Sequence, residues 1–196
     1  MALTTKGMGK KAYILGKAAA VFVSMGYTAV TMKDIVDECG ISRGGLYKYY
    51  SSTKEIFLDI LSAGQEDDGS FFTESMEQGM NAIAILSGFL QQQKNNLLNI
   101  KNTIRLAAYE FFLSNRSNDV ESILKRQYAN SMSVLSQVLN YGIDRNEITK
   151  ITSGEVESVA NQIIILLEGL NILALSKQIS PQLIDGQFDL LIKNIK

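Results

Sequence analysis

Four side chains suited to nucleic-acid contacts lie within seven consecutive positions of the sequence: Arg43, Tyr47, Lys48 and Tyr49. A guanidinium can donate two parallel hydrogen bonds to the edge of a guanine, and phenols and ammonium groups can hold the phosphates on either side. The combination predicts a surface that reads duplex DNA. The alternative is an ordinary helix with a solvated charged face, so the elements that position these side chains matter.

Residues 31–50 have the pattern of two short helices joined by a tight turn. Thr31 is a good N-cap, and Asp34 can return a hydrogen bond to the Thr31 amide, as in a capping box. Gly40 suits the end of the first helix, because a residue without a Cβ tolerates a positive φ. Ser42 then caps the second helix. This order of elements is typical of a helix-turn-helix.

Two glycines, Gly44 and Gly45, stand in the first turn of the second helix. Each costs about 1 kcal/mol relative to alanine in a helix. Glycine lets a backbone approach a phosphate closely, and the helix N-terminus favours an anion. Both glycines are therefore explained if this helix faces DNA.

These residues resemble the N-terminal signature of the tetracycline-repressor (TetR) family of bacterial regulators. The agreement covers about the first 60 residues. It consists of Thr31-Met32-Lys33-Asp34-Ile35, Gly40-Ile41-Ser42, Gly45-Leu46-Tyr47, Tyr49-Tyr50 and Lys54-Glu55. One departure is visible, because three residues instead of the family's usual two link the aromatic pair to Lys54.

The resemblance implies a three-helix DNA-binding head followed by a body that binds a ligand and forms dimers. It also implies that Lys54, near the start of the helix after the head, touches a phosphate. We predict a DNA-binding domain over residues 1–51 and a ligand-binding and dimerisation domain over residues 52–196. The residues expected at the DNA are Thr31, Ser42, Arg43, Gly44, Gly45, Tyr47, Lys48, Tyr49 and Lys54.

The net charge of −1 hides an uneven distribution along the chain. Residues 1–54 carry eight Lys/Arg and three Asp/Glu, a net charge of +5. The remaining residues carry eleven and seventeen, a net charge of −6. A basic end on an acidic body indicates that the N-terminal part faces nucleic acid.

The chain contains no histidine and one cysteine. Without histidine there is no Ser-His-Asp or Cys-His catalysis and no His-based metal site. Carboxylates and lysines remain, but no spacing pairs them for catalysis, so we predict no enzyme, no catalytic residues, no metal and no cofactor. A lone cysteine forms no internal disulfide, and no signal peptide or 18-residue apolar run is visible, which together predict a cytoplasmic protein without membrane contact.

One proline and the lack of strand-like alternation predict an all-α fold of about nine helices. After the three-helix head, helices are expected over 52–66, 72–98, 100–113, 119–144, 153–177 and 181–195, and the first head helix over 9–25. The acidic stretch 65–70 predicts a break. Further interruptions are expected near Gly79 and Gly88.

A ligand cavity between body helices would be lined by large, adaptable side chains. Glu110 and Glu168 also stand among apolar residues, where an unpaired carboxylate is costly and would favour a cationic, lipophilic ligand. The alternatives are that the apolar residues form the core and that each carboxylate lies at the surface or pairs internally. The candidates are Phe72, Met76, Phe89, Tyr109, Glu110, Phe112, Tyr128, Met132 and Glu168.

The last two helices carry more apolar residues than the core of one protomer is expected to bury. The stretch Ile163–Leu175 is apolar nearly all round, so we read it as a buried helix that must be covered on more than one side. Two such helices packed against their copies would form a four-helix interface between protomers. A homodimer also fits a palindromic operator, because its two heads can read successive turns of one groove.

Together these features predict a sequence-specific DNA-binding transcriptional regulator, a repressor released from its operator by a small hydrophobic ligand. One alternative is a DNA-binding regulator without a small-molecule effector. The other is a hydrophobic-ligand-binding protein whose head no longer reads DNA.

Overall fold

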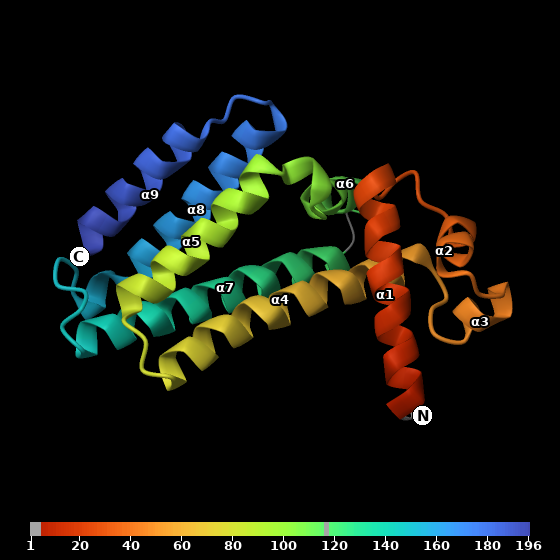
Figure 1. Ribbon diagram of the computed structural model, residues 1–196, viewed down its shortest axis with the longest axis horizontal. Helices are drawn as coiled ribbons and strands as arrows, with labels where there is room; N and C mark the ends of the chain where they lie inside the picture. The colour runs from red at the N-terminus through yellow and green to blue at the C-terminus, as the bar shows by residue number, and fades with distance from the viewer. Residues whose placement is uncertain (1–4, 116–117) are drawn as a thin grey trace. The chain divides into compact units, whose positions relative to one another are not determined.

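The computed structural model describes residues 5–115 and 118–196, and over these residues it contains nine α-helices, two short 3-10 segments and no strand (Figure 1). The predicted all-α class is confirmed. The helices are α1 (Thr5–Met25), α2 (Met32–Cys39), α3 (Arg43–Tyr47), α4 (Thr53–Glu77), α5 (Ala82–Leu98), α6 (Arg105–Ser114), α7 (Asn118–Asp144), α8 (Val156–Leu175) and α9 (Pro181–Ile195). The 3-10 segments are Ile100–Asn102 and Ser153–Glu155.

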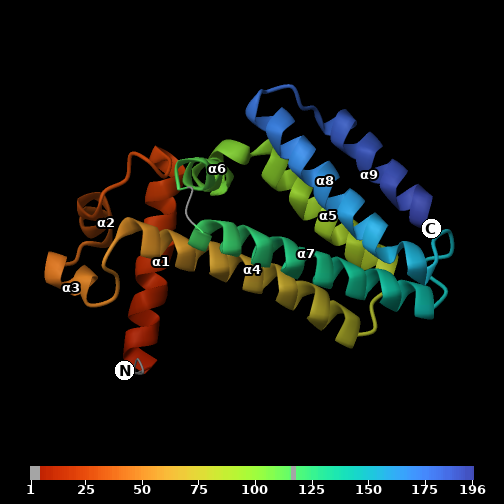
Figure 2. The same cartoon turned by 180° about the vertical axis from the view of Figure 1, so that it is seen from behind.

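The chain forms two compact units. The head unit comprises Met1–Glu66 and Lys101–Arg116, and the body unit comprises Asp67–Ile100 and Ser117–Lys196. Helix α6 therefore belongs with the head unit although it is distant in sequence, and both views show it beside one end of α1 (Figures 1 and 2).

The core of the head unit is built from the inner faces of its helices. Ile14, Phe22, Ile35, Leu46 and Phe57 are completely buried. Aromatic rings extend this core to α6, because Phe57 and Phe111 lie with ring centroids 5.1 Å apart. Ile14 and Phe22 of α1 thus form part of the core against which the helix-turn-helix packs.

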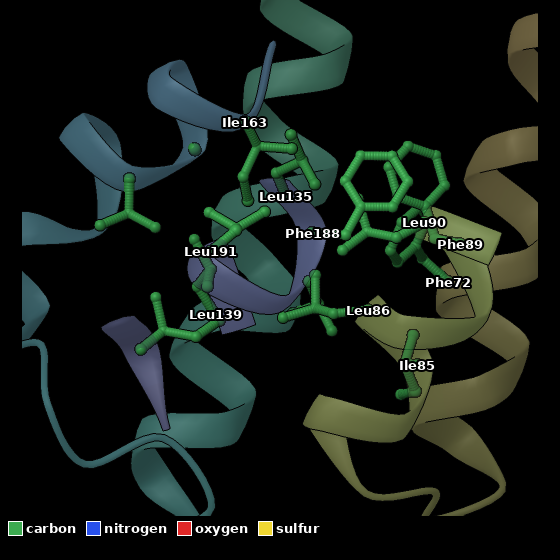
Figure 3. Packing of buried hydrophobic residues seen from close by; sticks show 14 of the residues in the cluster. Phe72, Ile85, Leu86, Phe89, Leu90, Leu135, Leu139, Ile163, Phe188 and Leu191 are labelled. Atoms are coloured by element: carbon green, nitrogen blue, oxygen red, sulfur yellow. The ribbon is translucent and has the colours of Figure 1, made fainter. Parts of the chain in front are cut away.

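The core of the body unit lies among α5, α7, α8 and α9, with a contribution from the end of α4 (Figure 3). Leu86, Leu139 and Ile163 are at most 1% exposed, and Phe188 of α9 also belongs to this cluster. Each helix contributes apolar residues at helical spacing, which is what the sequence pattern indicated for this region.

The predicted break at 65–70 is wrong, because α4 continues through it to Glu77. No proline stands in this stretch, and glutamate and aspartate keep their backbone N–H groups, so the helical hydrogen bonds can continue through it. The chain turns instead at Gly79, where φ is +73°, and Asn81 caps α5. The interruption expected at Gly88 is also wrong, since Gly88 lies within α5.

Smaller differences concern where helices begin. Helix α1 starts at Thr5, not at position 9. The sequence predicts Ser153 as the cap of α8, but Thr152 and Glu155 form a capping box around the 3-10 segment, and the regular helix begins at Val156. The Ser180 cap with Pro181 in the first turn of α9 is as the sequence predicts.

Helix α8 keeps an unusual amount of apolar surface. Ser153–Leu175 is long and apolar enough to cross a membrane by length and composition, although core helices pass the same test. Only 28% of its most apolar stretch is buried within the protomer. The sequence-based expectation that this helix is covered on more than one side is therefore not met by one copy of the chain.

Candidate nucleic-acid interface

The first turn of α2 is held by a capping box. The Asp34 amide donates to Thr31 Oγ1 at 3.4 Å, and the Thr31 amide donates to Asp34 Oδ2 at 2.8 Å. The Thr31 hydroxyl also donates to Asp34 Oδ2 at 2.6 Å. These hydrogen bonds from the hydroxyl and the amide lower the pKa of Asp34, because they stabilise its charged form.

The turn between α2 and α3 needs a glycine at its first position. Gly40 has φ +60° and ψ +34°, and its amide donates to the carbonyls of Asp37 and Val36. Other residues adopt this left-handed conformation only at a cost. Beside it, the Cys39 side chain is buried, and burial raises the pKa of its thiol. Cys39 is a small apolar residue of the core.

Helix α3 is positioned by an N-terminal cap and by a buried leucine near its C-terminal end. Ser42 Oγ accepts from the Gly45 amide at 3.1 Å. A Cβ on Gly45 would lie only 3.2 Å from that oxygen, so glycine relieves crowding at the cap. Leu46 is completely buried, which fixes the inner face of the helix, and the Tyr47 side chain is left 54% exposed.

A surface hollow of about 310 Å³ joins the two helices of the motif. Three of the residues expected at the DNA line it, namely Thr31, Arg43 and Tyr47. Its other lining residues belong to α2: Met32, Lys33 and Val36. The structure thus brings the N-terminus of α2 and the outer face of α3 together on one surface of the head unit.

Among the residues that the structure describes, the cations of this surface form no ion pair within 4 Å, although the charge of Lys33 contributes to lowering the pKa of the neighbouring Asp34. Neither Arg43 nor Lys33 takes part in an ion pair there, whereas Lys17 pairs with Glu38 at 2.9 Å and Lys11 with Asp59 at 2.6 Å. Unpaired guanidinium and ammonium groups around a hollow attract an anionic partner. The arrangement can bind phosphate and still leave a guanidinium for a base edge.

The remaining residues expected at the DNA lie outside the hollow. Ser42, Gly44 and Lys48 are exposed, and Gly45 and Tyr49 are partly buried. Lys54 is partly buried at the second position of α4. Their DNA contacts stay predictions.

Sequence reasoning missed Met32 and Lys33 as members of this surface. A signal was available, because Lys33 is a cation in the first turn of α2. Such a position is unfavourable for a lysine unless an anion is near.

The residues proposed for a ligand cavity are divided between the two units. In the body unit, Phe72 and Phe89 are buried with ring centroids 5.1 Å apart, and Met76 and Met132 pack against the same core. Tyr128 and Glu168 are exposed. In the head unit, Tyr109 and Phe112 are partly buried on α6, and Glu110 accepts hydrogen bonds from the loop between α1 and α2.

This geometry defines a class of protein: a helix-turn-helix protein with an electropositive surface suited to DNA. Comparison with known proteins agrees. The model of bacterial regulatory proteins of the tetR family matches residues 14–60, and that of the tetracyclin repressor-like C-terminal domain matches residues 85–180. The chain is 31% identical over 143 residues to the uncharacterized HTH-type transcriptional regulator YfiR of Bacillus subtilis, covering 72% of this chain and 69% of that protein.

The chain belongs to the TetR family of bacterial transcriptional regulators, whose members bind DNA operators, dimerise and bind small-molecule effectors. Solved structures share the fold. Reduced Escherichia coli NemR matches with a TM-score of 0.77 at 19% identity, covering 95% of this chain and 97% of that one. FadR from Bacillus subtilis in complex with stearoyl-CoA matches with a TM-score of 0.73 at 16% identity, covering 94% and 99%.

Proposed function

We propose that the protein is a dimeric repressor that reads a palindromic operator and leaves it when a small hydrophobic ligand binds the body unit. The observation that carries the proposal is the hollow between α2 and α3, where Arg43, Lys33 and Tyr47 gather without an ion pair among the described residues. The proposed action on DNA supports a cytoplasmic location.

The first experiment selects bound duplexes from a random DNA pool with the purified protein at near-physiological salt. A palindromic consensus with half-sites about one helical turn apart supports a dimeric reader. No enrichment at any salt contradicts sequence reading, provided that refolded protein, freed of any carried ligand, gives the same result. The enriched duplex is called the selected operator below.

The outer faces of the last two helices support dimerisation through α8 and α9. On α8, Ile165 is 65% exposed and Ile172 is 56% exposed, with Gly169 between them. On α9, an apolar residue, a glycine and an apolar residue follow one another in the same way: Leu183, Gly186 and Leu190. Glycines flanked by large apolar side chains let a second helix approach closely, and covering such a face removes apolar surface from water.

Substituting a glycine on α8 tests the proposed dimer interface separately from the fold of the protomer. A Cβ on Gly169 meets nothing within 4 Å in the protomer, so a side chain there starts in open space, and we expect Gly169→Leu to obstruct only a helix packed across it. Gly64→Leu is the matched control, since Gly64 is also helical with nothing within 4 Å. We expect sedimentation to show monomer for Gly169→Leu and dimer for the control and the wild type. A dimeric Gly169→Leu variant contradicts the proposed interface.

The apolar cluster of the body unit supports a hydrophobic ligand. Phe72 and Phe89 form a ring pair in this cluster, Met76 and Met132 pack against the same cluster, and methionines adapt readily to a guest. The fold is shared with a FadR bound to stearoyl-CoA and with a Clostridium perfringens putative fatty acid metabolism regulator. The ligand proposed is therefore one with a long apolar chain.

The ligand proposal is tested with a chain-length series of acyl-CoA thioesters and free fatty acids, scored by release of the selected operator. Free coenzyme A is the control for the charged group. Release that grows with chain length supports an apolar site. Operator binding that ignores every member of the series contradicts it, and would favour a regulator without such an effector.

A further inference from the structure

Two carboxylates from outside residues 1–51 hold the two flanks of the helix-turn-helix. Glu110 of α6 binds the loop that leads into α2, and Asp59 of α4 binds Tyr50, which follows α3. Both contacts lie within the head unit. We propose that Glu110 and Asp59, together called the carboxylate clamp, are positioning residues for DNA reading. This inference rests on the proposed function of the head unit as a DNA reader.

Glu110 is bound at three points. Its Oε2 accepts from the Tyr27 amide at 2.8 Å, the Thr28 amide at 3.2 Å and the Thr28 hydroxyl at 3.3 Å. A carboxylate that accepts backbone N–H groups makes stronger hydrogen bonds than a neutral acceptor. Three such bonds fix the path of the chain just before Thr31, where the surface hollow begins.

The loop is shaped around this carboxylate. Gly26 has φ +77°, and a Cβ placed on it would lie 2.6 Å from Glu110 Oε2. Glycine therefore satisfies the backbone conformation and makes room for the carboxylate at the same time. The neighbouring rings reinforce the contact, because Tyr27 and Phe111 pack edge to face with centroids 4.8 Å apart.

Asp59 holds the other flank. The Tyr50 side chain is only 2% exposed, so its hydroxyl needs an acceptor, and it donates to Asp59 Oδ2 at 3.0 Å. Lys11 pairs with the same oxygen at 2.6 Å and lies 5.4 Å from the centre of the Tyr50 ring. The Tyr50 amide in turn donates to the Leu46 carbonyl of α3 at 3.1 Å. The end of α3 is thus tied to α1 and α4.

The proposal can be tested by whether neutralising a clamp carboxylate strengthens or weakens DNA binding. Each carboxylate adds a negative charge to a unit that must approach phosphates, so neutralising one strengthens DNA binding if only charge matters. A positioning role predicts the opposite, because a loosened flank lets α2 and α3 adopt orientations that do not fit the groove.

The experiment compares Glu110→Gln, Asp59→Asn and the control Glu38→Gln in the full-length protein, each binding the selected operator. Glu38 is a head-unit carboxylate of α2 whose exposed ion pair with Lys17 contacts neither flank, and exposed ion pairs contribute little to stability. We expect the two clamp variants to bind about tenfold more weakly, the factor that corresponds to one lost charge-assisted hydrogen bond. The control should bind as tightly as the wild type or more tightly. Clamp variants that match the control overturn the proposal.

Amide hydrogen exchange without DNA provides the second readout. In Glu110→Gln, exchange should rise at Tyr27 and Thr28, while the amides within α1 and α4 stay protected. Glu110→Asp, which keeps the charge on a shorter arm, should restore part of the operator affinity. Increased exchange throughout the head unit would show that the carboxylate merely maintains the fold, which also overturns the proposal. A wild type that selects no duplex contradicts the proposed function instead, and the exchange readout still tests the clamp.

Discussion

Thr31 and Asp34 bind each other in both directions across the first turn of α2. The Thr31 amide donates to Asp34 Oδ2 at 2.8 Å, and the Asp34 amide donates to Thr31 Oγ1 at 3.4 Å. Because Thr31 also lines the hollow between α2 and α3, the group that begins the helix stands at the surface proposed to meet DNA. We therefore expect helix formation and DNA binding to depend on the same side chain.

This relationship predicts a pH dependence of stability. The Thr31 hydroxyl and amide lower the pKa of Asp34 from its ordinary value of 3.8. The folded state then binds fewer protons than the unfolded state just below that value, so the stabilisation is present above 3.8 and is lost as the pH falls through the folded-state pKa. Asp34→Asn should lower the urea midpoint at neutral pH, and the difference from wild type should shrink in acid. A difference independent of pH contradicts the ionic contribution.

Arg43 and Tyr47 should carry different parts of DNA recognition. We expect Arg43→Ala to weaken binding to the selected operator by about 1–3 kcal/mol and to relax the preference at one base position, as loss of a bidentate base contact does. Tyr47→Ala should weaken binding without relaxing a base position. Repeating the duplex selection with each variant, alongside circular dichroism and sedimentation, is the measurement. Unchanged affinity in both variants would sink the assignment of α3.

Lys33 should act through phosphate, because it is a cation in the first turn of α2 that lines the hollow and forms no salt bridge among the described residues. Lys33→Ala is expected to weaken binding to all duplexes alike and to reduce the slope of log affinity against log salt by about 1. Lys54→Ala should behave in the same way if Lys54 meets phosphate. Lys125→Ala, in an exposed pair with Glu121 in the body unit, is the control and should leave the slope unchanged. A Lys33 variant that alters base preference instead would assign the residue to the groove.

Local features of the fold could be predicted from the sequence, and features that depend on distant residues could not. The caps at Thr31 and Ser42 and the turn at Gly40 depend on residues three or four positions apart, so a pattern reveals them. The break predicted at residues 65–70 is wrong because it rests on the charge and glycine of that stretch, and no local pattern there marks the continuation of α4.

The candidate site divides in the same way. The outer residues of α3 were visible because cations and phenols cluster there, whereas Lys33 joins them only when α2 and α3 fold together. Glu110 stands among apolar residues in the sequence, which suggested a ligand contact. Its observed partners, Tyr27 and Thr28, are more than 80 residues away, and no spacing rule connects them.

Glycine-to-alanine substitutions should have opposite effects at two helical glycines, one packed in the body unit and one open in the head unit. A Cβ on Gly142 of α7 would lie 2.7 Å from both Ala82 Cβ and Ile148 Cδ1, and both of those residues are buried. Gly142→Ala should therefore overpack the core and lower the free energy of unfolding by about 1–3 kcal/mol. Gly16→Ala in α1 is the matched control, since its Cβ meets nothing within 4 Å. There the gain in helix propensity should raise stability by about 1 kcal/mol. Urea unfolding followed by circular dichroism measures both, and a Gly142→Ala protein as stable as Gly16→Ala would show that α5 and α7 are less closely packed than the distances indicate.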